Sequence, residues 1–345
     1  MSKIEITVVI PLFNRASLIL DTLYSIQAQT NNNWQCIVVD DASTDNSCKV
    51  VSDLAKNDSR IKLVERDRTP KGANTCRNIG LDLVSTEWVM FFDSDDIMLP
   101  NCLAERIKAF KENKGNELLL SQGLTFSHNG IMNFRNNPES QDYVKDIVSF
   151  NVALSTPAAV WKTSFIQNIS GWNENLQRWQ DCELFIRAFQ LDVKYKWISI
   201  IPDHLIRSQG NDNRITNSKS KYNNLEGLIT IFSEVFVTLN KTNKFIFAKS
   251  IFYYCLKSSY FISSQQNKAV LSIIKRTKML TRIKFIKLKL YMTLNAKFKK
   301  VKYLKGVLHL FISNEIKNYQ YNEFYQNTEL LELSKKNIEM QHYIR

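Results

Sequence analysis

The chain has 345 residues, 44% of them hydrophobic, which excludes an intrinsically disordered protein and allows one large domain with an appendage or two domains. Its net charge of +13 is uneven, because residues 241–345 hold 21 Lys/Arg and 5 Asp/Glu whereas residues 1–240 hold 25 and 28. The six cysteines have no regular spacing, which argues against a disulfide framework or a zinc site and favours reduced thiols.

The first hundred residues alternate between short apolar runs and stretches with helical spacing. The predicted strands are residues 6–13, 35–39, 61–65 and 88–92, and the predicted helices between them are residues 16–28, 45–57 and 72–84. This alternation favours a mostly parallel sheet with right-handed crossovers. The near-continuous Val/Ile runs suit strands that helices cover on both faces. The sequence therefore predicts an α/β fold.

Later segments carry weaker patterns. A helix is predicted at 101–111, where Pro100 suits the start, and another at 181–189. Strands are predicted at 117–128 and 194–200, with a short apolar piece at 158–161 between them and a polar loop at 207–220 after them. From about residue 225 the chain becomes helical, aromatic and basic. We therefore expect an α/β domain over 1–222 and a mainly helical, basic C-terminal region over 223–345.

Polar and acidic residues follow the first, second and fourth predicted strands. They are Asn14 and Arg15, then Asp40 and Asp41, then the DSDD of residues 93–96. Carboxylates this close repel one another unless a cation or a basic group neutralises them. One such group could be a helix N-cap. Because ligands bind outside the carboxyl ends of parallel strands, three groups at one edge favour a ligand site.

Four segments, in this order, resemble the nucleotide-binding half of family 2 glycosyltransferases with the GT-A fold. They are VVIPLFNR, VVDDASTD, GANTCRNIG and FFDSDDIMLP, and the resemblance covers about residues 4–220. It implies a mostly parallel nucleotide-binding sheet flanked by helices. It also implies an inverting transferase that moves a sugar from a nucleotide-sugar to an acceptor hydroxyl with a divalent cation, Mn²⁺ or Mg²⁺.

The resemblance assigns roles to residues of these segments. Asp93 and Asp95 match the Asp-x-Asp pair that holds the metal, and Asp95 is the expected direct ligand. Asp41 matches the acid that contacts the base, usually uracil, which favours a UDP-sugar. His204 resembles a position that closes near the diphosphate as a further metal ligand, although a histidine beside a strand is commonly structural. The other expected donor-binding residues are Pro11, Asn14, Gly72, Arg77, Asp96 and Arg207.

Two of these assignments leave alternatives open. Arg77 faces the donor by resemblance, but a surface arginine on a helix is an equal alternative. In WQDCELFIRAF, Asp181 matches the general base that takes the proton from the acceptor hydroxyl. Gln180 replaces the usual glutamate before it, and Glu183 is the reserve candidate. The alternative for Asp181 is an N-cap of the following helix.

The basic C-terminal region interleaves lysines with apolar residues, notably over 244–262 and 276–305. Such a stretch suits an anionic membrane surface, and a lipid-linked or carbohydrate acceptor would explain that location. A helical domain with a solvated basic face is the alternative, and no motif predicts nucleic-acid binding. No apolar run reaches the ~18 residues of a spanning helix, and no secretory signal is recognisable. We expect a cytoplasmic protein, peripheral on the inner face of the plasma membrane.

Three functions are compatible with these patterns. The first is a metal-dependent, non-processive inverting glycosyltransferase in surface polysaccharide or glycolipid synthesis. The second is a phosphoaspartate-type phosphatase that uses DSDDI, although that motif should follow the first strand rather than the fourth. The third is a non-enzymatic binding module that acts through the basic region. The four ordered segments favour the first.

Overall fold

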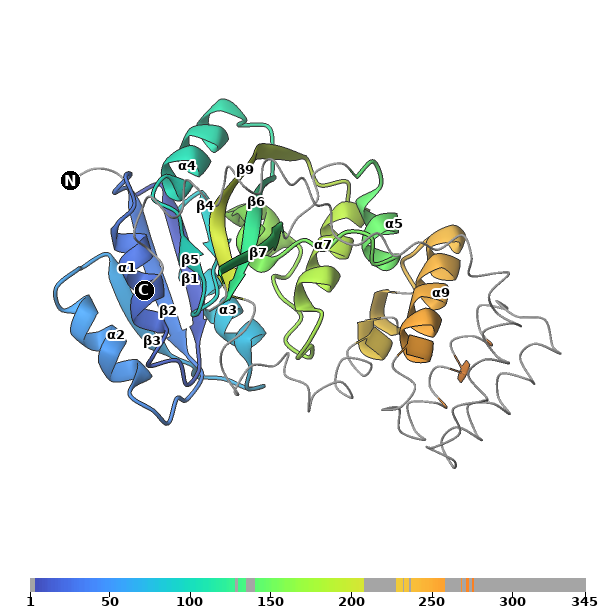
Figure 1. The fold of residues 1–345 in the computed structure, drawn as a ribbon, viewed down its shortest axis with the longest axis horizontal. Helices are drawn as coiled ribbons and strands as arrows, with labels where there is room; N and C mark the ends of the chain where they lie inside the picture. The colour runs from blue at the N-terminus through green and yellow to red at the C-terminus, as the bar shows by residue number, and fades with distance from the viewer. Residues whose placement is uncertain are drawn as a thin grey trace. The chain divides into compact units, whose positions relative to one another are not determined.

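The computed structural model describes residues 4–127, 130–134, 140–207 and 228–257 apart from 232 and 236, together with the single residues 268, 271, 272 and 275. The described residues divide into two compact units. The first contains those up to 141 and from 153 to 207, and the second contains 142–152 and those from 228 onward (Figure 1). The candidate site described below lies wholly in the first unit.

A parallel sheet forms the core of the first unit. Its strands are β1 (Ile6–Leu12), β2 (Trp34–Asp40), β3 (Ile61–Glu65) and β4 (Trp88–Phe91), and they lie side by side in the order β3-β2-β1-β4. All three pairings are parallel. Every residue of β1 is buried, as the uninterrupted apolar run predicted. The four predicted strands are confirmed.

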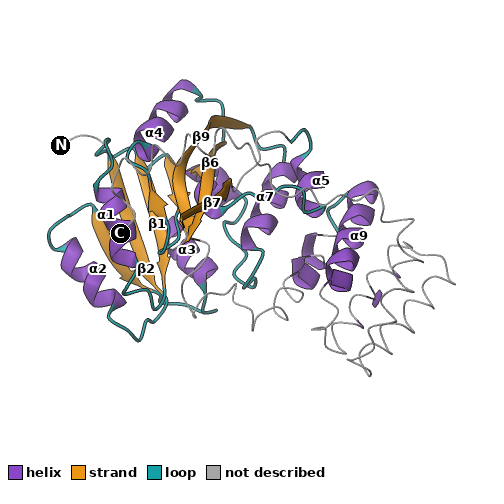
Figure 2. Ribbon diagram, in the orientation of Figure 1, coloured by secondary structure: helices purple, strands orange, loops and turns teal. Residues whose placement is uncertain are grey.

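Helices cover both faces of this sheet (Figure 2). They are α1 (Ile19–Gln27), α2 (Ser47–Ala55), α3 (Ala73–Asp82) and α4 (Cys102–Glu112). Apolar residues of α1, α2 and α4 pack with Ile6, Val8 and Ile10 of β1 in one hydrophobic cluster. On the opposite face, Cys76 and Ile79 of α3 pack against β2. The two faces explain why β1 shows no polar alternation.

The sheet continues with strands of mixed direction beyond β4. They are β8 (Ala159–Lys162), β6 (Leu118–Ser127), β9 (Tyr195–Arg207) and β5 (Ile97–Met98), with β7 (Gly130–Phe134) paired to β6. The predicted strand at 194–200 ends seven residues too early, because β9 extends to Arg207. Its second half pairs with both β5 and β6, although Pro202-Asp203-His204 interrupts the apolar pattern. Shorter elements are η1 (Thr156–Ala158) and α6 (Thr163–Asn168), and α7 (Gln180–Gln190) precedes β9.

The strand order reverses at β1. From β1 the chain passes to β2 and β3 on one side, then crosses to β4 on the other side. Such a switch point opens a crevice at the carboxyl ends of the two strands that flank it, and ligands of open α/β sheets bind there. The polar groups after β1 and β4 lie at the carboxyl ends of the two neighbouring strands at this switch point.

The described part of the second unit is helical. It contains α5 (Tyr143–Val148), which Asp142 caps by accepting the Lys145 N–H at 2.9 Å, and α9 (Lys241–Lys257). Phe150 and Phe247 meet edge to face, with their ring centroids 6.5 Å apart. The residues at 208–227, where the predicted domain boundary falls, and the basic stretch 276–305 lie outside the described residues, so both predictions stay open. No helix in the described part combines the length and hydropathy needed to cross a bilayer.

Candidate active site

The loops after β1 and β2 are joined to each other at the switch point. Asn14 follows β1 with a left-handed φ of 51°, a conformation that asparagine tolerates better than most residues. Its N–H donates to Ser43 Oγ at 3.0 Å, and its Oδ1 accepts the Thr44 N–H at 2.8 Å. Asn14 was predicted to line the donor pocket; the structure shows that it joins the loops after β1 and β2.

Asp41 lies directly after β2 and is buried. Its Oδ1 accepts from Arg66 Nε at 2.5 Å and from the Gly72 N–H at 3.3 Å. Gly72 has φ +146°, which a residue with a side chain rarely adopts. The structure thus brings together Asp41 and Gly72, two predicted residues from separate segments. Pro11 lies nearby in β1, in register with Val39 near the end of β2.

The DSDD segment forms a tight turn at the end of β4, in which the Asp96 N–H donates to the Asp93 carbonyl at 3.2 Å. Arg77 Nη2 donates to Asp93 Oδ1 at 2.7 Å, and Arg15 Nε lies 3.9 Å from Asp95 Oδ2.

A third arginine also holds this turn. The Arg207 N–H donates to Asp96 Oδ1 at 2.9 Å, and its Nε donates to the Asp95 carbonyl at 3.1 Å. The side chains of Arg15 and Arg77 therefore lie against two of the crowded carboxylates, and Arg207 bonds the turn through its backbone N–H and its side chain. The positive charge of these arginines reduces the repulsion among the carboxylates of the DSDD turn.

The acids of this turn also fit a divalent cation. Asp93 uses only one carboxylate oxygen in its ion pair with Arg77, and its side chain is 38% exposed. Mg²⁺ binds to proteins through one or two carboxylates and completes its shell with substrate phosphates and water. Among the described residues, no three His, Cys, Asp or Glu side chains form a cluster that could hold a metal alone. Asp93 and Asp95 suit a cation that arrives with a diphosphate.

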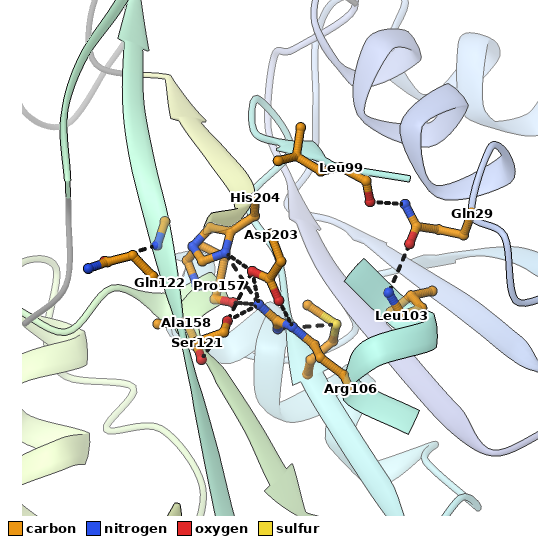
Figure 3. A network of polar contacts seen from close by, with 12 residues as sticks. Gln29, Leu99, Leu103, Arg106, Ser121, Gln122, Pro157, Ala158, Asp203 and His204 are labelled. Carbon is orange, nitrogen blue, oxygen red and sulfur yellow. Dashed lines mark hydrogen bonds and ion pairs between the residues drawn. The ribbon is translucent and has the colours of Figure 1, made fainter. Parts of the chain in front are cut away.

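His204 lies in a different environment, within the sheet (Figure 3). Its ring is fully buried, its Nδ1 lies 2.6 Å from Asp203 Oδ1, and Arg106 Nη2 lies 3.3 Å away. Its Nε2 faces Gly123, where an added Cβ would overlap the ring. Burial lowers the pKa of His204 below its ordinary value, which favours the neutral ring. These contacts agree with a structural role for His204 rather than with a role as a metal ligand.

The first turn of α7 presents Asp181. The residue before the helix is Trp179, which has a left-handed φ of 59°, so Trp179 rather than Asp181 occupies the N-cap position. The N-cap alternative for Asp181 is therefore wrong. The Asp181 carboxylate is partly exposed and accepts the Cys182 N–H at 2.9 Å. Glu183 is buried in a two-bond ion pair with Arg187 at 2.8 and 2.9 Å, which makes it a poor reserve base.

Arg77 connects the acidic turn to α7. Besides Asp93, its guanidinium donates to Gln180 Oε1 at 3.0 Å and lies 4.5 Å from the centroid of the Trp172 ring. Only 4% of Arg77 is exposed, so the alternative of a surface arginine is wrong. The contacts to Gln180 and Trp172 were missed at the level of the sequence, because the two partners lie about a hundred residues further along the chain.

Comparison with known proteins agrees with this geometry. The family described as Glycosyl transferase family 2 matches residues 7–143, which contain the loops after β1, β2 and β4. The chain carries a family 2 glycosyltransferase domain. A Campylobacter jejuni protein, GalNAc(5)-diNAcBac-PP-undecaprenol beta-1,3-glucosyltransferase, is 38% identical over 111 residues, 32% of this chain and 35% of that protein. The Escherichia coli UDP-Glc:alpha-D-GlcNAc-diphosphoundecaprenol beta-1,3-glucosyltransferase WfgD is 35% identical over 113 residues, 33% of this chain and 44% of WfgD.

The fold of the glycosyltransferase domain is also found in solved structures. Staphylococcus aureus TarS 1–349, in complex with UDP-GlcNAc, superposes with a TM-score of 0.61 at 17% identity, over 90% of this chain and 92% of that one. This likeness supports the GT-A fold that the sequence predicted. The matched stretches span well under two thirds of the length of both curated relatives.

The family match and the candidate site do not coincide along the chain. Asp41, Arg77 and the DSDD turn lie within the matched residues 7–143 of the glycosyltransferase domain. Asp181 and Arg207 lie beyond them. The structure brings Gln180, beside Asp181, to Arg77, and it brings Arg207 to the DSDD turn. The roles of the individual residues stay predictions.

Proposed function

We propose that this chain is a metal-dependent inverting glycosyltransferase that transfers one sugar from a UDP-sugar to a hydroxyl of a lipid-linked saccharide. The product would contribute to a surface polysaccharide or glycolipid. One observation carries the proposal: buried Arg77 bonds both Asp93 of the acidic turn and Gln180 of α7. This link supports a single site that contains both the expected metal ligands and the expected base.

The nucleotide would bind against the loops after β1 and β2. In this proposal Asp41 accepts a hydrogen bond from the base, and Pro11 and Asn14 line the pocket. Gly72 has no side chain, so the donor can approach its backbone closely. A UDP-sugar is the first donor to test, because the matched Escherichia coli relative is named for UDP-Glc.

The acidic turn would hold the diphosphate through the cation. When bound, Mn²⁺ or Mg²⁺ acts as a Lewis acid that neutralises the charge developing on the departing diphosphate. Asp95 and Asp93 would supply carboxylate oxygens. Asp96 and Arg207 fix the shape of the turn, because Arg207 bonds both the Asp96 carboxylate and the Asp95 carbonyl. A preformed turn reduces the ordering that the donor must impose when it binds.

Asp181 would act on the acceptor. Inversion requires that the hydroxyl attack from the face of the sugar opposite the leaving diphosphate, with a base within hydrogen-bonding reach of its proton. Asp181 is partly exposed at the start of a helix, and Glu183 is occupied by Arg187, so Asp181 is the better base of the two. It would accept the proton as the new glycosidic bond forms.

The acceptor and the location are proposed from the relatives. Both matched relatives are named for undecaprenol-diphosphate-linked saccharides, so a polyprenyl-diphosphate saccharide is the acceptor class that we propose. Such a lipid lies in the membrane. A cytoplasmic protein that binds the inner membrane face through its basic region would meet it there.

The decisive experiment is transfer from UDP-sugars to a polyprenyl-diphosphate saccharide, with and without Mn²⁺, by wild-type protein and Asp181→Asn. We expect Asp181→Asn to retain donor binding in a thermal-shift titration and to lose transfer by about 10²–10⁴-fold. Asp192→Asn is the matched control, because it removes an exposed carboxylate just past the other end of the same helix. Transfer by Asp181→Asn at the wild-type rate would refute the assignment of the base, and no transfer from any donor would refute the function.

A further inference from the structure

Helix α3 holds the segment that leads into α7. Asn74, Arg77 and Asn78 have the i, i+3, i+4 spacing that places side chains on one face of a helix. Asn74 Nδ2 donates to the Asn173 carbonyl at 2.6 Å. Asn78 Nδ2 donates to the Trp172 carbonyl at 2.8 Å, and Asn78 Oδ1 accepts the Trp172 N–H at 2.8 Å. The backbone before α7 is therefore fixed to α3.

Arg77 lies at the centre of this face and is restrained from several directions. Nη2 donates to Asp93, and Nη1 is shared between Asn74 Oδ1 and Gln180 Oε1, each at 3.0 Å. One face of the guanidinium lies over the Trp172 ring. A planar group held by three oxygens and a ring has little freedom to move alone, so displacement of Arg77 would disturb both the acidic turn and α7.

Gln180 contributes an oxygen of fixed direction and no charge. Its Nε2 donates to the Leu176 carbonyl at 3.1 Å, which leaves Oε1 directed at Arg77. A glutamate could not make the bond to Leu176, because a carboxylate has no donor. Among the described residues, Asp93 is the only acid in an ion pair with Arg77. A glutamate at 180 would compete with Asp93 for the same guanidinium.

We propose that Gln180 is a positioning residue: its amide joins α7 to Arg77 while leaving the arginine's charge to Asp93. The inference rests on the proposed function and deepens it. Gln180 does not touch the reacting atoms, and it acts through Arg77 on Asp93 and through the first turn of α7 on Asp181. It sets how strongly Arg77 competes with a divalent cation for Asp93, and it fixes where the base lies.

Two substitutions separate the two effects. Gln180→Met keeps the length of the side chain but removes both amide bonds, so Arg77 keeps Asp93 while α7 loses its attachment. We expect kcat to fall by about tenfold to a hundredfold, as for a base that is misplaced by about 1 Å, with the donor KM changed by less than about threefold. Gln180→Glu adds a carboxylate beside Arg77, which weakens the ion pair between Arg77 and Asp93. We expect Mn²⁺ to bind several-fold more tightly in the presence of UDP.

The test measures Mn²⁺ binding by electron paramagnetic resonance of the free ion, hydrogen exchange of residues 172–182, and kinetics with the donor found active. Gln190→Glu is the matched control, since it places the same charge at the other end of α7. Faster exchange over 172–182 in Gln180→Met, tighter Mn²⁺ binding in Gln180→Glu alone and the kcat effect would support the proposal. Mn²⁺ affinity in Gln180→Glu equal to that of the control, or unchanged kcat in Gln180→Met, would overturn it. Binding and exchange need no sugar transfer, so they test this inference even if the proposed function fails.

Discussion

Two clusters of arginine and aspartate lie in the same sheet and serve different ends. At the open edge, Arg15 and Arg77 lie against Asp95 and Asp93, and one oxygen of Asp93 is left out of its ion pair. Inside the sheet, Arg106 donates to both carboxylate oxygens of Asp203 at 2.8 and 3.0 Å.

The inner cluster has several further hydrogen-bond partners. Arg106 also donates to Ser121 Oγ at 2.6 Å and to the Pro157 carbonyl at 2.8 Å, while His204 covers the same carboxylate (Figure 3). Burial by itself would raise the pKa of the Asp203 carboxyl, but Arg106 and His204 outweigh it and hold that pKa well below its usual range. The comparison teaches that charge and residue type do not distinguish a ligand site from a structural one. What distinguishes the edge is Asp93, whose side chain is 38% exposed against 13% for Asp203 and whose second oxygen lies outside its ion pair.

The largest effect on stability is expected from breaking the inner cluster. Arg106 is fully buried, so Arg106→Met leaves the Asp203 carboxylate, whose side chain is only 13% exposed, without its main partner. We expect a loss of ~3–5 kcal/mol in the free energy of unfolding. Tryptophan fluorescence during urea unfolding measures it, because all six tryptophans lie in the first unit. Arg15→Met, at the edge, breaks a longer contact of 3.9 Å to Asp95 and should cost less. Equal losses in the two variants would contradict the distinction.

A smaller effect is expected at Gly123. Gly123→Ala would force a methyl group against the buried His204 ring, and overpacking of this kind costs about 1–3 kcal/mol. The matched control is Gly115→Ala, where an added Cβ meets nothing within 4 Å. Unfolding curves of the two variants give the comparison. If both alanines change stability equally, the His204 ring is not packed as tightly as described.

The buried ring of His204 should make the stability of the protein depend on pH. The pKa of His204 is lowered in the folded protein, so below its ordinary pKa of 6.5 the unfolded chain binds more protons and stability falls as the pH falls. The groups facing its ring are Asp203 and Arg106. His204→Asn keeps an N–H donor for Asp203 but cannot titrate. Between pH 7 and pH 5 this group should lower the free energy of unfolding of the wild type by at most ~1.4 kcal/mol for each pH unit. His204→Asn should lack this contribution.

The smallest effect on stability is expected at the edge. Asp95→Asn removes one of the crowded carboxylates but keeps the shape of the side chain, and the free energy of unfolding should change less than in Arg106→Met. The same variant should need more Mn²⁺ to bind a UDP-sugar in a thermal-shift titration. A large loss of stability would place Asp95 with the structural acids instead. An unchanged Mn²⁺ requirement would remove it from the proposed metal site.

Local patterns in the sequence determined the first half of the fold. The Val/Ile runs of β1 and β2 are buried on both faces, so the apolar pattern alone identified them as central parallel strands. The order of the acidic loops then placed Asp41 and the DSDD turn at one edge, because parallel strands end on the same side of a sheet. These features depend on short-range periodicity and on a topological rule, which a sequence displays.

The partners of the charged residues were decided only by the tertiary structure. The sequence could not show that Arg77 is buried between Asp93 and Gln180, because Gln180 lies 103 positions away and reaches α3 only through the packing of the 171–180 segment. It also could not separate Asp203, enclosed by Arg106, from the acids at the edge. The energy of a charge depends on its neighbours and its exposure to water, and folding brings those neighbours from distant parts of the chain.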